Sequence, residues 1–288
     1  MPATRPYRSL LYIPGSKPRA LKKAATLPCD AIIFDLEDAV TAEAKDEARS
    51  LLAETLPGAD YGPRARIVRV NGADTQWGAA DLEAMCQVAP DAILLPKVGH
   101  ADEIAAVKAQ LDAAGATATK IWAMMETPAG IFNALSIAQA PGMGGFVMGT
   151  NDLAKELNCR SRADRLPMMF ALQQCLMAAR AAGIVAIDGV YNAFKDDEGL
   201  KAECEQGRDL GFDGKTLIHP AQLEITNAAF APSASEIDLA RRQIAAFEEV
   251  EASGQGVAVV DGRIVENLHI ETARATLAKA EAIAAMAE

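Results

Sequence analysis

The sequence is poor in the side chains that build soft metal centres and disulfide frameworks. Its 288 residues include three histidines and five cysteines, and no two cysteines form a C-x-x-C pair. An odd number of scattered cysteines is typical of reduced thiols and argues against disulfides and structural zinc. Neither a disulfide-stabilised fold nor a histidine-rich metal site is therefore indicated.

Positive charge and long apolar runs are also scarce. The net charge of −11 argues against nucleic acid or an anionic membrane as the main partner. No segment is long and apolar enough to span a bilayer, and the opening MPATRPYRS lacks the apolar stretch of a signal peptide. Together these features predict a cytoplasmic protein.

What the sequence does contain is a series of short apolar runs separated by Ala-rich segments with helical periodicity. Eight such units indicate an α/β protein with a (β/α)8 TIM barrel. A doubly wound open sheet is the rival, but IPGSKPRA after the first run is not the glycine-rich phosphate turn G-x-G-x-x-G. The expected strands cover residues 8–15, 31–38, 65–72, 92–98, 120–126, 145–153, 184–191 and 214–220.

The pattern changes after the eighth run, which predicts a barrel domain over residues 1–228 and a C-terminal segment over 229–288. Ser233 and Glu236 form a capping box before an amphipathic helix that Gly254 closes. VAVVDGRIVE, residues 257–266, then reads as a hairpin with an Asp-Gly turn, and an Ala-rich helix follows. The segment is predicted to be a helix–hairpin–helix lid.

Chemistry in such a barrel takes place at the carboxyl ends of the strands, where the loops build the pocket. Glu126 and Asp152 each follow an apolar run at neighbouring strand ends. Two converging carboxylates without nearby His or Cys predict a Mg²⁺ site. A carboxylate could instead cap the following helix, which would be the better interpretation of either residue alone.

Basic residues lie at other strand ends. Arg69 could form an ion pair with the acids that end the second strand, Asp35, Glu37 and Asp38, stabilise a developing enolate, or do both. Lys97 permits Schiff-base chemistry, although pairing with an acid or phosphate is commoner. The group Lys17, Arg19, Lys22 and Lys23 is either a solvated helix face or a site for a phosphate-rich substrate handle. His219 could act as a base, but we favour a role in orienting its loop through backbone hydrogen bonds.

The chain resembles the citrate lyase β-subunit-like family, which belongs to the HpcH/HpaI aldolase superfamily and includes malyl-CoA and citramalyl-CoA lyases. The matching motifs occur in family order and cover almost the whole barrel: RSLLYIPGSKPRALKKA, DAIIFDLEDAV, IVRVNG, ILLPKV, METPAGI, GTNDLAKEL and GKTLIHPAQ.

The resemblance implies a Mg²⁺-dependent lyase that reversibly cleaves a 3-hydroxyacyl-CoA of the malyl-, citramalyl- or methylmalyl-CoA type. The products would be acetyl-CoA or propionyl-CoA and a small 2-oxo acid. It implies that Glu126 and Asp152 bind the metal and that Arg69 contacts the substrate carbonyl. Glu37 and Asp38 would support the water shell of the metal. Arg19 would contact CoA, and the neighbouring Lys22 and the pocket-edge Lys97 are further candidates for substrate binding.

In this family the C-terminal lid can bring a carboxylate to the active site of a neighbouring subunit in a homotrimer or homohexamer. The presumed base there is usually an aspartate, whereas GRIVEN places Glu266 at that position. Because glutamate is one methylene longer, two reactions stay open: carbon–carbon lysis and hydrolysis of the thioester. A citrate lyase β subunit acting on a carrier-bound acyl group is a third alternative. A non-catalytic binding barrel is disfavoured because Arg69, Glu126 and Asp152 are all present.

Overall fold

The computed structural model describes residues 5–254 and 256–286, which divide into two compact units. Tyr7–Ala229 form the first unit, and the chain from Phe230 onward forms the second together with Arg5 and Pro6. Among the described residues, no helix combines the length and the apolarity needed to cross a membrane.

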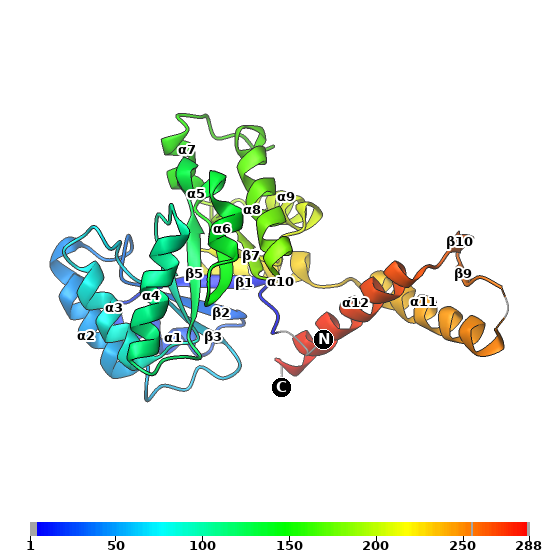
Figure 1. The fold of residues 1–288 in the computed structure, drawn as a ribbon, viewed down its shortest axis with the longest axis horizontal. Coiled ribbons are helices and arrows are strands. Elements are labelled where there is room, and N and C mark those ends of the chain that lie inside the picture. The colour runs from blue at the N-terminus through cyan, green and yellow to red at the C-terminus, as the bar shows by residue number, and fades with distance from the viewer. Residues whose placement is uncertain (1–4, 255, 287–288) are drawn as a thin grey trace. The chain divides into compact units, whose positions relative to one another are not determined.

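Eight parallel strands in the first unit pair in sequence order, and the eighth pairs with the first to close a barrel (Figure 1). The predicted (β/α)8 fold is confirmed. The strands are β1 (Ser9–Pro14), β2 (Ala31–Asp35), β3 (Ala65–Arg69), β4 (Ala92–Leu95), β5 (Lys120–Met125), β6 (Met143–Met148), β7 (Val185–Asp188) and β8 (Gly214–Leu217).

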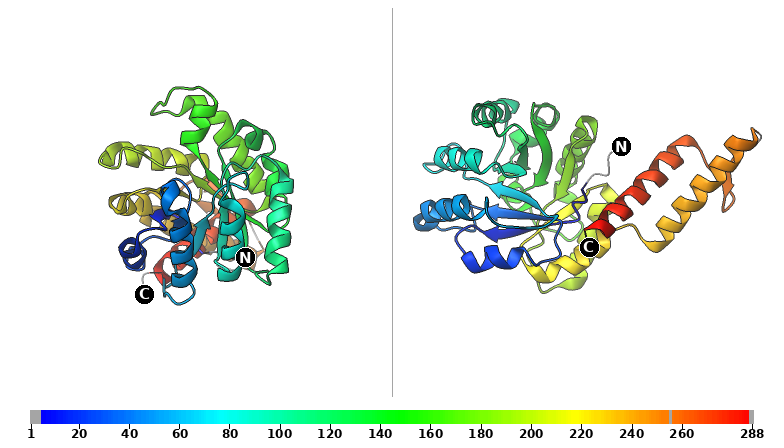
Figure 2. Two further views of the ribbon diagram at one scale, coloured as in Figure 1. Left: turned by 90° about the vertical axis from the view of Figure 1, so that its left-hand side faces the viewer. Right: turned by 90° about the horizontal axis from the view of Figure 1, so that it is seen from below.

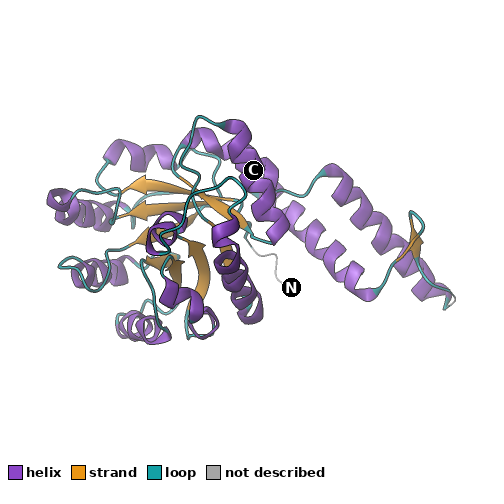
Figure 3. Cartoon of the chain, turned by 90° about the horizontal axis from the view of Figure 1, so that it is seen from above, coloured by secondary structure: helices purple, strands orange, loops and turns teal. Residues whose placement is uncertain are grey.

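The strands are apolar almost throughout because both of their faces are buried. Residues two apart point to the same side of a strand, so Ala31 and Ile33 face the barrel interior with Ala65 and Ile67 of the next strand. Helices cover the outer face, as the ring of helices around the strands in Figure 3 shows. This arrangement directs the carboxyl ends of all eight strands toward one side of the barrel.

The expected sixth strand, 145–153, was placed wrongly at both ends. The strand is Met143–Met148, and a helix begins at Thr150, so Asp152 lies in the first turn of that helix. Gly144 and Gly145 both lie within the strand. A Cβ at Gly145 would overlap the ring of Trp122 on β5, so the glycine leaves room for the indole.

The helices of the first unit lie mainly between consecutive strands. They are α1 (Pro18–Ala24), α2 (Lys45–Thr55), α3 (Gly78–Val88), α4 (Ala101–Ala113), α5 (Pro128–Phe132), α6 (Ala134–Ala138), α7 (Thr150–Glu156), α8 (Met169–Ala182), α9 (Asp197–Leu210) and α10 (Leu223–Phe230), the last ending one residue into the second unit. Three short 3-10 helices accompany them: η1 (Ala42–Ala44), η2 (Leu166–Met168) and η3 (Pro220–Gln222).

The second unit is a helix–hairpin–helix, as its sequence predicts. Helices α11 (Ala234–Ser253) and α12 (Asn267–Ala285) lie side by side, with strands β9 (Val259–Val260) and β10 (Arg263–Ile264) between them in sequence (Figure 2). The capping box at the start of α11 is present, since Glu236 N–H donates to Ser233 Oγ at 3.2 Å and Ser233 N–H donates to Glu236 Oε2 at 2.7 Å.

The hairpin turn follows from its Asp-Gly sequence. Asp261 and Gly262 have φ angles of 51° and 73°, the left-handed conformations that a tight two-residue hairpin turn requires. Arg242 of α11 binds Asp261 Oδ1 at 2.7 Å, and Val260 and Val265 are buried together with Ile270 of α12. The hairpin is therefore fixed to its own helix pair.

Candidate active site

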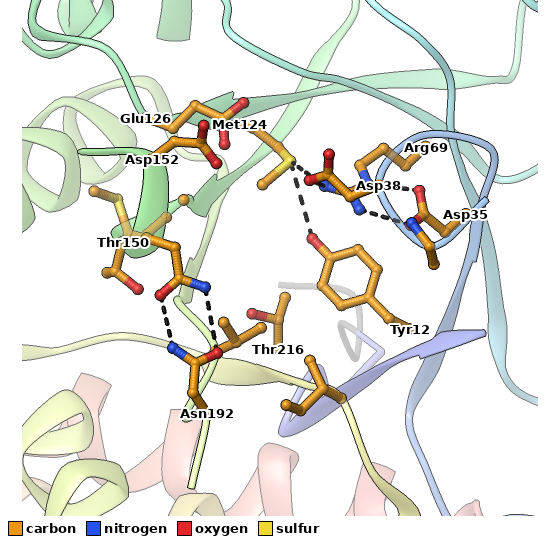
Figure 4. Close-up of a pocket in the computed structure, with 16 residues that line it drawn as sticks. Tyr12, Asp35, Asp38, Arg69, Met124, Glu126, Thr150, Asp152, Asn192 and Thr216 are labelled. Atoms are coloured by element: carbon orange, nitrogen blue, oxygen red, sulfur yellow. Dashed lines mark hydrogen bonds and ion pairs between the residues drawn. The ribbon is translucent and has the colours of Figure 1, made fainter. Parts of the chain in front are cut away.

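A cavity of about 290 Å³ opens among the carboxyl ends of the strands (Figure 4). It brings together three of the predicted site residues, Arg69, Glu126 and Asp152, with Asp38 at its edge. Its full lining is Tyr12, Asp35, Asp38, Ala39, Arg69, Met124, Glu126, Met148, Gly149, Thr150, Asn151, Asp152, Val190, Asn192, Thr216 and Ile218.

Arg69, the last residue of β3, is held in a fixed plane by Asp35, the last residue of β2. Nε donates to Asp35 Oδ1 at 2.7 Å and Nη2 donates to Asp35 Oδ2 at 2.6 Å. The ring of Tyr12 lies against the guanidinium, with its centroid 4.8 Å from Cζ. Burial alone would lower the pKa of Arg69, but the Asp35 hydrogen bonds and nearby charges raise it well above its usual value, so the group stays charged.

The acidic pair after β2 also meets Arg69. Nη1 lies 2.8 Å from Glu37 Oε2 and 3.4 Å from Asp38 Oδ2. Burial raises the pKa of Glu37 to about 7, against the opposing effect of Arg69. Glu37 is thus bound to the guanidinium and is not among the residues that line the cavity, whereas Asp38 is exposed and lines it.

Glu126 follows β5 and is almost completely buried at 2 % exposure. Its Oε1 accepts a hydrogen bond of 2.7 Å from the backbone N–H of Lys97. The backbone of Lys97 has a left-handed conformation at this point, with a φ of 52°. The residue is exposed to solvent. Lys97 therefore contributes its backbone N–H to the site.

The second predicted metal ligand, Asp152, lies close to Glu126. Both carboxylates line the cavity, and Figure 4 shows them turned toward each other. Burial raises the pKa of Glu126 to about 7, and the charge of Asp152 adds to this rise. Room for the Glu126 carboxylate depends on Gly149, since a Cβ at that position would overlap both Oε2 and the Cβ of Glu126.

The cavity has an excess of negative groups. Four of its lining side chains are carboxylic acids, namely Asp35, Asp38, Glu126 and Asp152, and Arg69 is the basic one. Among the described residues, no group of three or more His, Cys, Asp or Glu side chains is placed to hold a metal. Two carboxylates facing a cavity nevertheless fit Mg²⁺, which commonly takes one or two and fills its other positions with water or substrate oxygens.

The predicted CoA contacts lie outside this cavity. Arg19 and Lys22 are exposed on α1, and Lys22 lines a separate hollow of about 330 Å³ that also includes Tyr61. Glu266 belongs to the second unit, where it is exposed just before α12 and its N–H donates to His269 Nδ1 at 2.9 Å. The roles of these three residues stay predictions.

The surroundings of His219 and of the cysteines indicate structural roles. His219 Nδ1 accepts a hydrogen bond of 3.2 Å from the N–H of Ala221, which confirms the preferred loop-orienting interpretation. The five cysteines are unpaired, and four of them are buried.

The predicted ion pair between Arg69 and the acids that end the second strand is confirmed, and Asp35 is the principal partner. Other residues of the cavity carried no assignment from sequence, and one of them, Tyr12, lies over this pair. Asn151 and Asn192 form a reciprocal amide pair at the edge of the cavity. The position of Asp35 at a strand end was a usable signal, whereas nothing in the sequence pairs two asparagines 41 residues apart.

Known proteins resemble this chain over nearly its full length. It is 67 % identical over 280 residues to a (3S)-malyl-CoA thioesterase of Cereibacter sphaeroides, covering 97 % of this chain and 96 % of the relative. It is 35 % identical to the citrate lyase subunit beta of Escherichia coli, covering 96 % and 94 % of the two chains.

Solved structures agree with this relationship. CitE from Mycobacterium tuberculosis, in complex with magnesium, acetoacetate and coenzyme A, matches with a TM-score of 0.80 at 30 % identity and covers 98 % of this chain and 100 % of that one. The family model for HpcH/HpaI aldolase/citrate lyase matches residues 8–220, which span all eight barrel strands. The chain is therefore an enzyme of the HpcH/HpaI aldolase/citrate lyase family.

Proposed function

We propose that this enzyme hydrolyses the thioester of (3S)-malyl-CoA to malate and free CoA in a Mg²⁺-dependent reaction. The observation that carries the proposal is the cavity in which four carboxylic acids and one clamped arginine meet. The 67 % identity to a (3S)-malyl-CoA thioesterase, over almost the whole of both chains, favours hydrolysis among the reactions open to the family.

The donor set supports a magnesium ion held by Glu126 and Asp152. When bound there, Mg²⁺ supplies Lewis-acid polarisation of a substrate oxygen. The carboxylate of Glu126 accepts a hydrogen bond from the backbone N–H of Lys97, and burial raises its pKa to about 7. A divalent cation beside this buried carboxylate would stabilise its ionised form.

Arg69 would hold the acyl group and stabilise negative charge on its oxygen. A guanidinium carries five N–H donors. Asp35 accepts from two of them, and Glu37, Asp38 and Met124 surround Nη1, which leaves the second N–H of Nη2 for a substrate oxygen. Since the Asp35 clamp fixes the guanidinium plane, this donor is oriented before the substrate arrives.

The chemical step adds water across the thioester. The water oxygen bonds to the carbonyl carbon, a base takes one of its protons, and the carbon–sulfur bond breaks as the CoA sulfur leaves and is protonated. Glu266 is our candidate for the base, because it is an exposed carboxylate at the start of α12 in the predicted lid. Arg69 stabilises the oxyanion between bond formation and bond cleavage.

Carbon–carbon lysis is the second candidate. The relatives named citrate lyase subunit beta, at 35 % identity over nearly the whole chain, favour it. Lysis of malyl-CoA breaks the bond between the hydroxyl-bearing carbon and the carbon next to the thioester, and it gives glyoxylate and acetyl-CoA.

Product analysis separates the two reactions. Incubation of the purified enzyme with malyl-CoA and Mg²⁺ should release malate and free CoA, which a thiol reagent and chromatography detect. Glyoxylate and acetyl-CoA as the initial products would establish lysis instead. Glu126→Gln and Asp152→Asn should each abolish turnover and calorimetric Mg²⁺ binding while leaving the circular dichroism spectrum intact, and full turnover in either would refute the metal site.

A further inference from the structure

A second cavity, of about 380 Å³, adjoins the active-site cavity. It lies between the start of α7, the segment before α8, and the loop that leads from β7 into α9. The residues that line it are Thr150, Asn151, Ser161, Arg162, Ala163, Arg165, Met168, Val190, Tyr191, Asn192, Ala193, Gly199, Ala202 and Glu203.

The two cavities meet at a pair of asparagine side chains. Thr150, Asn151, Val190 and Asn192 line both of them. Asn192 Nδ2 donates to Asn151 Oδ1 at 2.8 Å, and Asn151 Nδ2 donates to Asn192 Oδ1 at 3.3 Å (Figure 4). The two amides thus satisfy each other across the shared boundary. Loss of either side chain would remove both hydrogen bonds and open that boundary.

One arginine that lines the second cavity, Arg165, has a nitrogen without a hydrogen-bond partner in the described part of the chain. Arg165 lines it at 3 % exposure, with Nη1 on both oxygens of Asp188 and Nε on Gln206 Oε1. Its Nη2 is buried and has no hydrogen-bond partner among the residues that the structure describes. An unmade hydrogen bond at a buried charged group is costly, so an acceptor that reached Nη2 would gain binding free energy.

The acids near this arginine already form ion pairs with other basic residues. Lys215 Nζ lies 2.6 Å from Glu203 Oε1, and Arg162 Nη2 lies 2.6 Å from Asp164 Oδ2. The lining therefore carries two guanidinium groups, of Arg162 and Arg165, each paired with an acid outside the lining, and one carboxylate, of Glu203, which is paired with Lys215. A ligand group that ends in a carboxylate fits this composition better than an apolar group of the same shape.

We propose that the Asn151–Asn192 pair sets the acyl-group specificity of the enzyme. The paired amides confine the substrate to the small malyl group. The cavity behind them is a latent subsite for a carboxylate-bearing substituent on the hydroxyl-bearing carbon, where malyl-CoA has only hydrogen. This inference rests on the proposed function, because it assumes that the acyl group occupies the active-site cavity.

Asn192→Ala tests the inference, since Asn192 lies on a loop and its loss opens the boundary without touching Glu126 or Asp152. Calorimetry in the presence of Mg²⁺ compares glyoxylate with oxaloacetate, which carries the extra carboxymethyl group. We expect the affinity ratio of oxaloacetate to glyoxylate to rise on the order of tenfold in the variant. The kcat/KM ratio of citryl-CoA to malyl-CoA should rise in parallel.

Two comparisons make the test specific. In Asn192→Ala/Ala202→Leu, the leucine on the exposed face of α9 fills the second cavity and should cancel the gain. 4-Methyl-2-oxopentanoate matches the shape of oxaloacetate but has an uncharged isopropyl group in place of the second carboxylate, and it should gain much less. Equal gains for both acids would contradict the carboxylate subsite, and an unchanged ratio in Asn192→Ala would overturn the barrier role.

The proposed hydrolysis and the proposed specificity role of the amide pair can be refuted independently of each other. If the wild-type enzyme binds glyoxylate with Mg²⁺ but does not release CoA from malyl-CoA, the proposed hydrolysis is wrong and the binding comparison still tests the amide pair. If malyl-CoA is hydrolysed and the wild type already accepts citryl-CoA equally well, the specificity proposal is wrong.

Discussion

At the scale of single residues, the site depends on one glycine as much as on its charged groups. Gly149 ends the connection from β6 to α7 and lies against the side chain of Glu126. Its φ of −92° is open to any residue, so the restriction at this position comes from the neighbouring carboxylate and not from the backbone.

Gly149→Ala should therefore weaken Mg²⁺ binding by tenfold or more, on the order of the loss seen when groups that position metal ligands are changed. Isothermal titration calorimetry with MgCl₂ measures the effect. Gly58→Ala is the matched control, because a Cβ at Gly58 has no neighbour within 4 Å. Equal Mg²⁺ affinity in the two variants would show that metal binding by Glu126 does not depend on the space that Gly149 leaves beside it.

Arg69→Lys tests the clamp formed with Asp35. Lysine keeps the charge but lacks the planar fork that bonds both oxygens of Asp35. We expect kcat to fall on the order of a hundredfold, as when a preorganised oxyanion donor is removed. The free energy of unfolding should fall by about 1–3 kcal/mol, because the buried Asp35 loses hydrogen bonds. Steady-state kinetics and urea unfolding measure the two effects, and wild-type kcat would exclude a role for the guanidinium.

The residue types at the site were predictable because reactive groups at strand ends stand out against apolar strands. Arg69, Glu126 and Asp152 could be chosen in this way, and they do line one cavity. The contribution of Lys97 was not predictable, because its backbone N–H and left-handed conformation leave no mark in the sequence. The same holds for the Asn151–Asn192 pair, which depends on two loops meeting in space.

At the scale of elements, a buried ionic network joins β7, β8, α9 and the segment before α8. Lys215 of β8 is completely buried and lies 3.2 Å from Asp188 of β7 and 2.6 Å from Glu203 of α9. Arg165 also binds Asp188, at 2.7 Å. The network crosses four segments that lie apart in sequence, and the sequence pattern GKTL gave no sign of a buried lysine.

The network should make stability depend on pH in a defined direction. Burial would raise the pKa of Asp188, but Lys215 and Arg165 outweigh it and hold that pKa below its ordinary value of 3.8. A carboxylate with a lowered folded-state pKa stabilises the fold above its unfolded value, and the stabilisation is lost as the pH falls through the folded value. Urea unfolding should therefore show a steep loss of stability below about pH 4, part of which Asp188→Asn should remove.

Lys215→Met should cost about 3–5 kcal/mol, the usual effect of removing one partner from a buried ion pair. Lys201→Met on the solvent side of α9 is the matched control. Its pair with Glu205 is 3.9 Å long and exposed, and such pairs contribute about 1 kcal/mol or less. Similar unfolding midpoints for the two variants would mean that the buried network contributes little to stability.

Element boundaries were less predictable than the elements themselves. Eight barrel strands were expected and eight form, because a strand buried on both faces leaves a continuous apolar run. The sixth was extended too far because only Gly149 separates the end of β6 from the start of α7, and its start was placed two residues late, within a glycine pair that admits the indole of Trp122. The hairpin was recognisable from Asp261 and Gly262, which adopt the left-handed conformations that this dipeptide favours.

At the scale of the whole molecule, the role of the second unit as a lid is a proposal. Glu266 is exposed on that unit, next to the apolar and exposed Ile264 and Leu268. If the lid serves a neighbouring subunit, then mixing Glu266→Gln with Asp152→Asn subunits should restore part of the activity that each lacks alone. Glu271→Gln, an exposed acid on α12, is the control and should keep wild-type turnover. If no activity is recovered after confirmed subunit exchange, Glu266 does not act in the active site of a neighbouring subunit.

The excess of acids in the cavity has a consequence for the order in which ligands are taken up. Four carboxylic acids face one guanidinium there, within a chain of net charge −11. The metal-free cavity repels a malyl carboxylate, and the repulsion is strongest at low ionic strength. Cation and acyl substrate should thus add in compulsory sequence, cation first. Initial-rate patterns at varied Mg²⁺ and malyl-CoA should be those of an ordered mechanism. Random addition would show that the acids of the cavity do not prevent the substrate from binding before the cation.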